Sequence, residues 1–370
     1  MNIAVDAREL LGRPTGVGTY LARLLEQWQR RPEARAHRWV LYYPEAEGGA
    51  ITPAGGRRVA EGGLCETRAV PGHAGTWWEQ RALAAAIGRD RPDVLFAPGY
   101  TAPVAVEVPV VLTIHDVSFF AHPEWFGRRE GLRRRVITRW SARRAAAILT
   151  ISEFSKREIV ARLGVADHRV EVIRPGISRP TAMPPGDGRP PLVLFVGSIF
   201  NRRRVPDLLR AFAAVSRQVS GARLEIVGDN RTHPLEDLEG LARSLGVGDR
   251  VRLRSYVPDE QLAALYAQAR VFAFLSEYEG FGFTPLEALA HAIPVVVLDT
   301  PVAREVYEDA AIYVGAGDLD GTANALQRLL VDADARQAQL QRAQRVLGRY
   351  CWNDAAHRTL AAIERAGARG

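Results

Sequence analysis

The stretch that decides the fold is Val271–Asp299, which reads VFAFLSEYEGFGFTPLEALAHAIPVVVLD. It opens with a short apolar run rich in β-forming residues, Val271–Leu275, and continues into a glycine-bearing loop, Ser276–Phe283. A helical segment follows, and Val295–Leu298 is a second apolar run. The order strand, loop, helix, strand predicts a β-α-β unit of a parallel sheet.

Two acids bracket the expected start of this helix. Thr284 is the expected N-cap, with Pro285 at the first helical position. Glu287 follows three residues after that cap, where a carboxylate can either close a capping box or serve a ligand, and both interpretations stay open. Glu279 precedes Gly280 in the loop, where carboxylates commonly bind ligands. Free amides and the helix dipole favour negative charge here, so the loop predicts a phosphate or sugar site.

These residues resemble a known family. The segment 279–287, EGFGFTPLE, followed by ALA and then by PVV, resembles the E-x7-E signature of family 4 retaining glycosyltransferases, which have the GT-B fold and use nucleotide-sugar donors. Ala292 stands where the family usually has Gly. The resemblance implies a catalytic role for Glu279 in binding sugar hydroxyls, and it implies that Glu287 holds the ribose. The donor-binding residues implied in this stretch are Gly282, Phe283 and Glu287.

Composition places the chain among two-domain globular proteins. At 370 residues it exceeds the size at which single cores stop growing. A hydrophobic content of 47% and a charged content of 25% are typical of a soluble protein, and no apolar run approaches the length of a membrane span. The N-terminus does not resemble a signal peptide, and Cys65 and Cys351 are too isolated for a disulfide frame. We therefore expect a cytoplasmic protein.

Apolar strands alternate with helical segments, which predicts an α/β fold with doubly wound parallel sheets. The first Rossmann-like domain, on the acceptor side, is expected over residues 1–177. Residues 178–191, SRPTAMPPGDGRPP, read as a linker. The nucleotide-sugar-binding domain is expected over 192–352. The resemblance implies a C-terminal helix, about 353–370, that crosses back to the first domain, and two facing domains with the site in the cleft between them.

A second glycine-bearing loop lies near the N-terminus. The strand Asn2–Val5 leads into residues 12–18, and a helix is expected from Thr19 to about Arg30. Gly16 and Gly18 on their own are consistent with a plain tight turn. In the resembled family the equivalent loop lies beside the acceptor and the donor phosphates, which makes both glycines candidates for that role.

A histidine closes another predicted strand. Pro109–Ile114 ends at His115-Asp116, and ligands in such folds gather at the carboxyl ends of strands. A buried structural histidine is the alternative. The segment TIHDVS resembles the family's donor-facing His-Asp element, which implies that a neutral His115 donates to a sugar hydroxyl as a catalytic group, with Asp116 secondary. Ser152 and Ser155 are interpreted as helix caps.

Three consecutive arginines follow the strand Leu192–Val196 and its closing glycine. They are either surface charge or a diphosphate site, because guanidinium groups suit phosphate through paired N–H donors. The family usually has Arg-Lys here, and Arg202-Arg203 match by position. The resemblance therefore assigns both to the donor diphosphate.

The chain is basic, with a net charge of +7. The densest cluster, Gly127–Arg144, has eight arginines and one acid, and the spacing of Leu132, Val136 and Trp140 predicts a helix. This segment is either a solvated basic face or a surface for peripheral contact with the inner face of an anionic membrane. Nucleic acid is not an expected partner, because aromatics do not interleave with the arginines.

The sequence thus predicts a retaining, metal-independent glycosyltransferase. It would move a hexose from a UDP- or GDP-type donor to a glycan or lipid-linked acceptor in cell-surface polysaccharide synthesis, and mannose is the suggested sugar. No cofactor or metal is expected, and the acid pair in Asp318-Leu319-Asp320 is interpreted as a helix cap. The alternatives are a nucleotide-sugar epimerase of the same fold and a non-enzymatic basic protein that binds nucleic acid.

Overall fold

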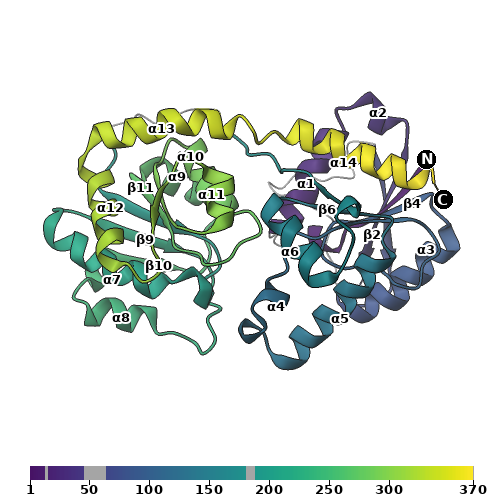
Figure 1. Cartoon of the computed structure of the whole chain (residues 1–370), viewed down its shortest axis with the longest axis horizontal. Helices are drawn as coiled ribbons and strands as arrows, with labels where there is room; N and C mark the ends of the chain where they lie inside the picture. The colour runs from purple at the N-terminus through teal and green to yellow at the C-terminus, as the bar shows by residue number, and fades with distance from the viewer. Residues whose placement is uncertain (13–15, 46–63, 181–187, 370) are drawn as a thin grey trace. The chain divides into compact units, whose positions relative to one another are not determined.

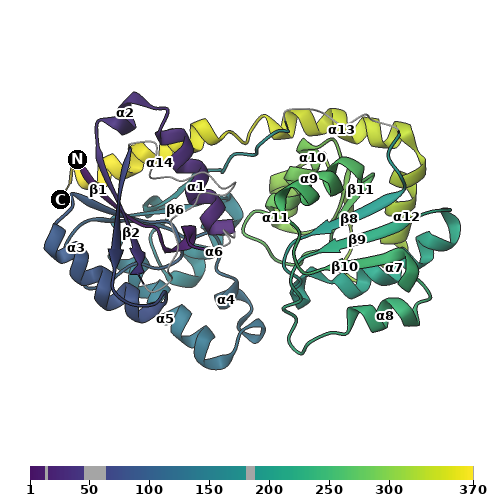
Figure 2. The same cartoon turned by 180° about the vertical axis from the view of Figure 1, so that it is seen from behind.

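The computed structural model describes residues 1–12, 16–45, 64–180 and 188–369, and the chain divides into two compact units. Unit 1 comprises Met1–Gly176 together with the C-terminal segment from Cys351, and unit 2 is Ile177–Tyr350. Part of the predicted linker, residues 181–187, lies outside the described residues. Each unit is a parallel sheet covered by helices on both faces (Figures 1 and 2).

The sheet of unit 1 has the strand order β3-β2-β1-β4-β5-β6-β7, and neighbouring strands run parallel. The order reverses beside β1, which lies between β2 and β4. Such a reversal leaves a crevice at the carboxyl ends of the strands. The strands are β1 (Asn2–Asp6), β2 (Arg38–Pro44), β3 (Cys65–Val70), β4 (Val94–Ala97), β5 (Val110–Thr113), β6 (Ala147–Thr150) and β7 (Val170–Val172).

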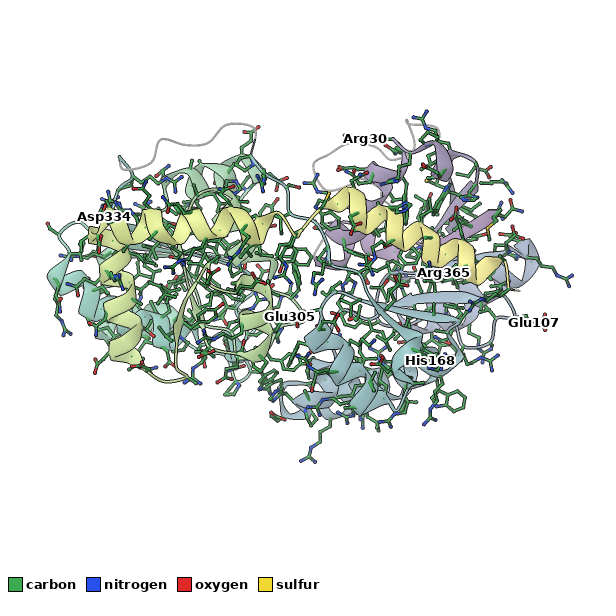
Figure 3. The ribbon with its side chains drawn as sticks, turned by 45° about the horizontal axis from the view of Figure 1, so that its top comes forward. Arg30, Glu107, His168, Glu305, Asp334 and Arg365 are labelled. Carbon is green, nitrogen blue, oxygen red and sulfur yellow. The ribbon has the colours of Figure 1, made fainter. Side chains whose placement is uncertain are left out.

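Helices cover both faces of this sheet. The indole of Trp28 on α1 stacks on Trp39 of β2 at 4.6 Å and donates to the carbonyl of Ala356 on α14 at 2.9 Å, so α1 and α14 share one face. The other face packs against α3, α5 and α6. In Figure 3, Arg365 projects from α14, and its Nη2 lies 2.7 Å from Oε2 of Glu171 on β7. The helical elements are η1 (Arg8–Leu10), α1 (Gly16–Trp28), α2 (Pro32–Arg35), η4 (Trp78–Leu83), α3 (Ala84–Asp90), α4 (Ser118–Ala121), η5 (Pro123–Trp125), α5 (Arg128–Arg144), α6 (Glu153–Leu163), η6 (Asp167–Arg169) and α14 (Trp352–Gly367).

Unit 2 repeats this plan with the order β10-β9-β8-β11-β12-β13. Its strands are β8 (Leu192–Val196), β9 (Arg223–Val227), β10 (Val251–Arg254), β11 (Val271–Phe274), β12 (Val295–Leu298) and β13 (Ile312–Val314). Its helical elements are η7 (Asn201–Arg203), α7 (Val205–Gln218), α8 (Leu238–Ser244), η8 (Gly248–Arg250), α9 (Asp259–Gln268), α10 (Phe283–Ala290), α11 (Pro301–Tyr307), α12 (Leu319–Val331) and α13 (Ala333–Leu347). β11 and β12 pair in parallel across α10, which confirms the predicted β-α-β unit.

Two helix starts differ from the prediction. α10 begins at Phe283 with Gly282 as its N-cap at φ 89°, so Thr284 is an internal helical residue rather than the cap. α1 begins at Gly16, so Gly16 and Gly18 form its first turn instead of a preceding loop. Glycine has a low helix propensity, which is why the pattern placed both glycines outside the helix.

Candidate active site

An ion pair lies at the carboxyl ends of β8 and β11 in unit 2. Arg203 comes from η7 after β8, and Glu279 comes from the loop after β11. Nε of Arg203 donates to Oε1 of Glu279 at 3.0 Å, and the hydroxyl of Ser276 donates to the same oxygen at 2.8 Å. The Arg203 and Glu279 side chains are only 15% and 18% exposed. The structure therefore brings together two of the predicted site residues, and Ser276 is a third member that the sequence analysis missed.

Glycines make room for the Arg203 side chain. Gly197, which follows β8, has φ 141°, and a Cβ at this position would overlap Nη1 of Arg203. Nη1 instead donates to the carbonyl of Ser198 at 2.8 Å, and the guanidinium lies 5.0 Å from the ring centroid of Phe274. Arg203 is thus held from several sides and has little rotamer freedom left to lose when a ligand binds.

This arrangement leaves specific atoms for a ligand. Within the described residues, both hydrogen bonds to Glu279 fall on Oε1, so Oε2 can accept from a hydroxyl group. Nη2 of Arg203 makes no hydrogen bond within the same residues. One guanidinium nitrogen and one carboxylate oxygen of the same ion pair can therefore bind a ligand, which suits a ligand that carries both phosphate and hydroxyl groups.

The other two arginines of the run differ in their surroundings. The guanidinium of Arg202 lies 4.4 Å from the ring centroid of Phe200. Arg204 has φ 47° at the start of α7, and it forms ion pairs with Asp207 at 2.7 Å and with Glu277. Arg204 therefore serves the local structure, whereas Arg202 and Arg203 are the two that the sequence analysis assigned to the donor.

Tyr307 fixes the start of α10, and the sequence analysis missed it. Its hydroxyl donates to the carbonyl of Gly282 at 2.8 Å, and a Cβ at Gly282 would overlap that hydroxyl. Burial raises the pKa of Tyr307 well above its ordinary value, and the nearby Glu279 charge adds to the effect. Tyr307 thus links the N-cap of α10 to the surroundings of Glu279. No local sequence pattern predicts the role of Tyr307, because it lies on α11, a different helix.

Glu287 lies beyond the first turn of α10. Because Thr284 is not the N-cap, the capping-box interpretation of Glu287 is wrong. Oε2 of Glu287 instead accepts from the hydroxyl of Tyr266 at 3.3 Å, and the Tyr266 ring stacks on His291 at 4.7 Å. Burial raises the pKa of Tyr266 well above its ordinary value, with the Glu287 charge as a further cause. The ribose role of Glu287 stays a prediction.

His115 is buried after the end of β5 in unit 1. Its Nε2 lies 2.8 Å from the carbonyl oxygen of Pro98, and its ring meets Tyr20 edge-on at 5.0 Å. A carbonyl only accepts, so Nε2 carries the proton and Nδ1 is the acceptor. Burial lowers the pKa of His115, which favours the neutral ring. The lowered pKa agrees with the expected neutral ring. The one N–H of that ring is already bonded to Pro98, so the expectation that it donates to a sugar hydroxyl is wrong, and Nδ1 can only accept.

Asp116 has two partners in unit 1. Oδ2 accepts from the hydroxyl of Tyr100 at 3.0 Å, and Oδ1 accepts from the amide of Ser118 at 2.8 Å, at the start of α4. Ser152 caps α6, as predicted. Ser155 does not cap, because its hydroxyl donates to the carbonyl of His115 at 2.9 Å. Asp116 and Ser155 therefore fix the loop that carries His115.

The first turn of α1 packs beside this loop. Cγ1 of Val17, between Gly16 and Gly18, lies 3.2 Å from where a Cβ of Gly99 would stand. Gly99 precedes Tyr100, whose ring lies 5.6 Å from that of His115. The structure thus brings Gly16 and Gly18 to the same strand-end region as His115, although they belong to a helix.

A buried charge cluster lies in unit 1, and the sequence analysis did not single it out. Nη2 of Arg8 contacts Asp6 at 2.6 Å and Glu79 at 2.5 Å, and the hydroxyl of Thr101 donates to Glu79 at 2.7 Å. Burial raises the pKa of Asp6 to about 6, although Arg8 opposes the shift. Asp6 is the last residue of β1 and directly follows the predicted strand Asn2–Val5, so an acid at a strand end was the signal that could have located the cluster. The cluster ties η1, η4 and the loop after β4 together.

Metal ligands do not gather in the described residues, where no three His, Cys, Asp or Glu side chains come together in a possible metal site. Asp318 accepts from the amide of Gly321 at 2.8 Å and caps α12, which confirms its interpretation as a helix cap. None of the helices in the described residues has the length and apolarity needed to cross a bilayer.

Two doubly wound parallel sheets in one chain, with a glycine-bounded arginine and carboxylate at the strand ends of the second, define an α/β protein of the GT-B class. Residues 14–179 match the family model described as Glycosyltransferase Family 4, and residues 184–346 match the model described as Glycosyl transferases group 1. The chain belongs to the family 4 glycosyltransferases, which confirms the resemblance and the predicted fold class.

Similar proteins agree with this assignment. O-antigen chain mannosyltransferase B of Escherichia coli is 27% identical over 288 residues, which cover 75% of each chain. Sucrose-phosphate synthase from Thermosynechococcus elongatus superposes with a TM-score of 0.78 at 19% identity, over 100% of both chains. HepE from Anabaena, solved in complex with UDP and glucose, has a TM-score of 0.75 at 18% identity, over 99% of this chain and 100% of that one. The last two similarities show the fold.

Proposed function

We propose that this glycosyltransferase moves a hexose from a nucleotide-sugar donor to a glycan or lipid-linked acceptor during cell-surface polysaccharide synthesis, with retention of anomeric configuration and without a metal. The observation that carries the proposal is the Arg203–Glu279 pair. Nε of Arg203 and Oε1 of Glu279 lie 3.0 Å apart and bond to each other, and Nη2 and Oε2 of the same two side chains can meet a phosphate and a hydroxyl group of the donor. Unit 2 would bind the donor, and unit 1 would supply the acceptor side.

The donor would lie across the carboxyl ends of β8 and β11. Arg202, Nη2 of Arg203 and the amides at the start of α10 would stabilise the diphosphate, because preorganised donors act best where charge develops. Oε2 of Glu279 would accept from a sugar hydroxyl, and Glu287 would hold the ribose. The solved complex of HepE with UDP supports a nucleoside diphosphate in this fold. Thermal-shift measurements decide between UDP and GDP.

Transfer would proceed by front-face attack. The bond between the anomeric carbon and the diphosphate oxygen breaks, the acceptor hydroxyl oxygen attacks the same face, and its proton passes to the departing diphosphate. The positive charge of the two arginines offsets the negative charge that builds on the leaving group, which is the role a metal would otherwise fill. His115 would accept a hydrogen bond from the sugar through Nδ1.

The acceptor class and the sugar rest on similarity. The relative from Escherichia coli is named an O-antigen chain mannosyltransferase, which favours mannose and a cell-surface polysaccharide. The site chemistry alone is compatible with other hexoses, since hydroxyl recognition by Glu279 does not depend on which hexose is bound.

Thermal-shift measurements with UDP, GDP, ADP and their sugars test the donor. We expect one nucleoside diphosphate and its sugar to raise Tm, also in the presence of a chelator. Product analysis by NMR then reads the anomeric configuration. Donor epimerisation without an acceptor would instead indicate an epimerase, and an inverted product would exclude front-face transfer.

A further inference from the structure

The side of α5 that faces solvent carries apolar side chains. Leu132, Val136 and Trp140 recur every four residues and are 57%, 47% and 58% exposed. At 3.6 residues per turn they form one stripe, on the side opposite to the residues that pack against unit 1. Those packed residues are small or polar: Gly131, Thr138, Ser141 and Ala142. Amphipathic helices of globular proteins normally bury their apolar stripe, so α5 is inverted.

A tryptophan from a neighbouring element extends this stripe. Trp77 is 74% exposed, and the hydroxyl of the preceding Thr76 accepts from Nη1 of Arg133 on α5 at 2.6 Å. The guanidinium of Arg81 lies 5.1 Å from the Trp77 ring centroid. The other large apolar side chains that are exposed in the described residues, Leu235, Tyr256 and Val331, belong to unit 2. Apolar exposure in unit 1 is therefore concentrated at one surface.

Positive charge surrounds the same stripe. Helix α5 carries eight arginines and one acid, Glu130, which pairs with Arg133 and Arg134. Within the described residues, Arg129 and Arg143 are exposed and form no ion pair, and by helical spacing they fall between the apolar side chains. Large apolar and aromatic side chains flanked by arginine complement a layer of anionic headgroups over hydrocarbon.

We propose that this basic-aromatic face, formed by Trp77, Leu132, Val136, Trp140 and the arginines of α5, docks on an anionic lipid bilayer. The face is tied to the candidate site of unit 1, because Nη1 of Arg135 donates to the carbonyl of Phe119 on α4 at 3.2 Å. α4 begins at Ser118, two residues after Asp116. Docking would thus bring the strand end of His115 close to the membrane surface, and it does not depend on the identity of the donor.

Sedimentation with vesicles tests the proposal. We expect the full chain to bind phosphatidylcholine vesicles that contain about one-third phosphatidylglycerol, and to leave pure phosphatidylcholine vesicles unbound. The double variant Arg129→Gln/Arg143→Gln should partition about thirty-fold more weakly, and Trp140→Ala about tenfold more weakly. All these side chains are exposed, so Tm should stay unchanged. Val331→Ala and Arg342→Gln, exposed positions of unit 2, are matched controls and should bind like the parent.

Four results would overturn it: equal binding to both vesicle types, no binding to either, controls that weaken binding as much as Trp140→Ala, or salt-sensitive binding to DNA without binding to vesicles. Light scattering adds a further check. A dimer that Trp140→Ala converts to a monomer would show that the face joins two copies of the chain instead.

Discussion

In unit 1 the strand β1 lies between β2 and β4, and in unit 2 the strand β8 lies between β9 and β11, so both sheets reverse their order beside their first strand. The groups at the two reversal points differ. Unit 1 presents the buried, neutral imidazole of His115, with its N–H bonded to a carbonyl. Unit 2 presents Arg203 and Glu279, each partly exposed and each with an atom left for a ligand.

Unit 1 also contains opposite charges near its first strand, but these are paired with one another inside the protein. Arg8 contacts both Asp6 and Glu79, and the two carboxylates are almost fully buried. The same fold thus carries a closed charge cluster in one unit and an open one in the other. Burial decides which can meet an ionic ligand, since a buried charge needs all its partners inside the protein. We therefore expect an ionic ligand group to bind at Arg203 and Glu279 of unit 2 rather than at the buried charges of unit 1.

The largest expected effect tests the open pair in unit 2. Glu279→Gln keeps the size of the side chain and removes the charge beside Arg203. We expect kcat to fall by about 10²–10³-fold, the range seen when one preorganised polar group is lost. Steady-state kinetics gives the ratio, and circular dichroism reports the fold.

The matched control is Glu277→Gln, in the same loop. Glu277 pairs with Arg204, so the change should lower stability slightly and leave kcat near its parent value. Equal losses for the two variants would show that loop charge in general matters, and would remove Glu279 from the site.

A second test contrasts glycines at two helix starts. Gly282→Ala forces a Cβ against the hydroxyl of Tyr307 at φ 89°, and we expect a loss of about 3 kcal/mol in the free energy of unfolding. Gly16→Ala, at the start of α1, meets open space and should be neutral or slightly stabilising. Urea unfolding gives both values.

Tyr307→Phe removes the atom that the new Cβ would meet. The double variant Gly282→Ala/Tyr307→Phe should therefore recover part of the loss, leaving the cost of the positive φ. If the unfolding free-energy changes of the two single variants simply added in the double variant, the Tyr307 hydroxyl would not be what the Cβ at position 282 meets.

A third test separates the arginines of the run. Arg202→Ala should weaken binding of the nucleoside diphosphate by about 10–100-fold and change affinity for the free nucleoside little, since a charge-assisted hydrogen bond contributes about 1.5–3 kcal/mol. Arg204→Ala should lower Tm, because its ion pairs serve α7, and should leave affinity unchanged. Calorimetric titration measures both ligands, and an equal loss for nucleoside and diphosphate would contradict the phosphate role.

The sequence is informative where one continuous segment carries the signal. Leu192–Val196 and Val295–Leu298 are buried strands with the predicted bounds, because apolar runs of this kind fit only the interior of a parallel sheet. β3, Cys65–Val70, gives no such run, since it lies at the edge of its sheet and buries only Val70 fully. Its strand character comes from pairing with β2 rather than from its own residues.

The site residues also divide into those that one continuous segment predicts and those that depend on contacts between segments. The loop acids and the tandem arginines could be named from local spacing, but the contact between Arg203 and Glu279 joins segments 76 residues apart. Ser276 contacts Glu279 from three residues away in the same loop, whereas Tyr307 supports the site through a tertiary contact that no local pattern encodes. The proton position on His115 depends on the carbonyl of Pro98, which belongs to a different strand end.

A fourth test uses pH to probe the neutral group of unit 1. Burial lowers the pKa of folded His115 below its ordinary value of 6.5, so the unfolded chain binds this proton more readily. Stability from this group is present above about pH 6.5 and is lost as the pH falls through and below that value. The parent should therefore lose more stability between about pH 8 and about pH 5 than His115→Gln does.

The control is His168→Gln, an exposed histidine of the same unit (Figure 3), which should follow the parent. Urea unfolding at several pH values supplies the comparison. A parent and a His115→Gln variant with the same pH profile would mean that His115 is not held neutral by burial.

The smallest expected effect concerns the position where this chain departs from its family. Ala292 follows α10 at φ 53°, and its carbonyl accepts from Nη1 of Arg189 at 2.9 Å. A left-handed alanine costs about 1–2 kcal/mol in the folded state, and glycine removes this cost. Glycine also raises the conformational entropy of the unfolded chain, which offsets about 0.4–1 kcal/mol of the gain, so Ala292→Gly should stabilise unit 2 by about 0.5–1 kcal/mol. Arg91 ends α3 of unit 1 at φ 42°, and Arg91→Gly should act in the same direction. Activity should not change, because the turn follows the end of α10 opposite to the site. If Arg91→Gly stabilised the protein and Ala292→Gly did not, the hydrogen bond from Arg189 would depend on the backbone conformation that alanine holds at position 292. The two units would then differ in their turns as well as in their charges.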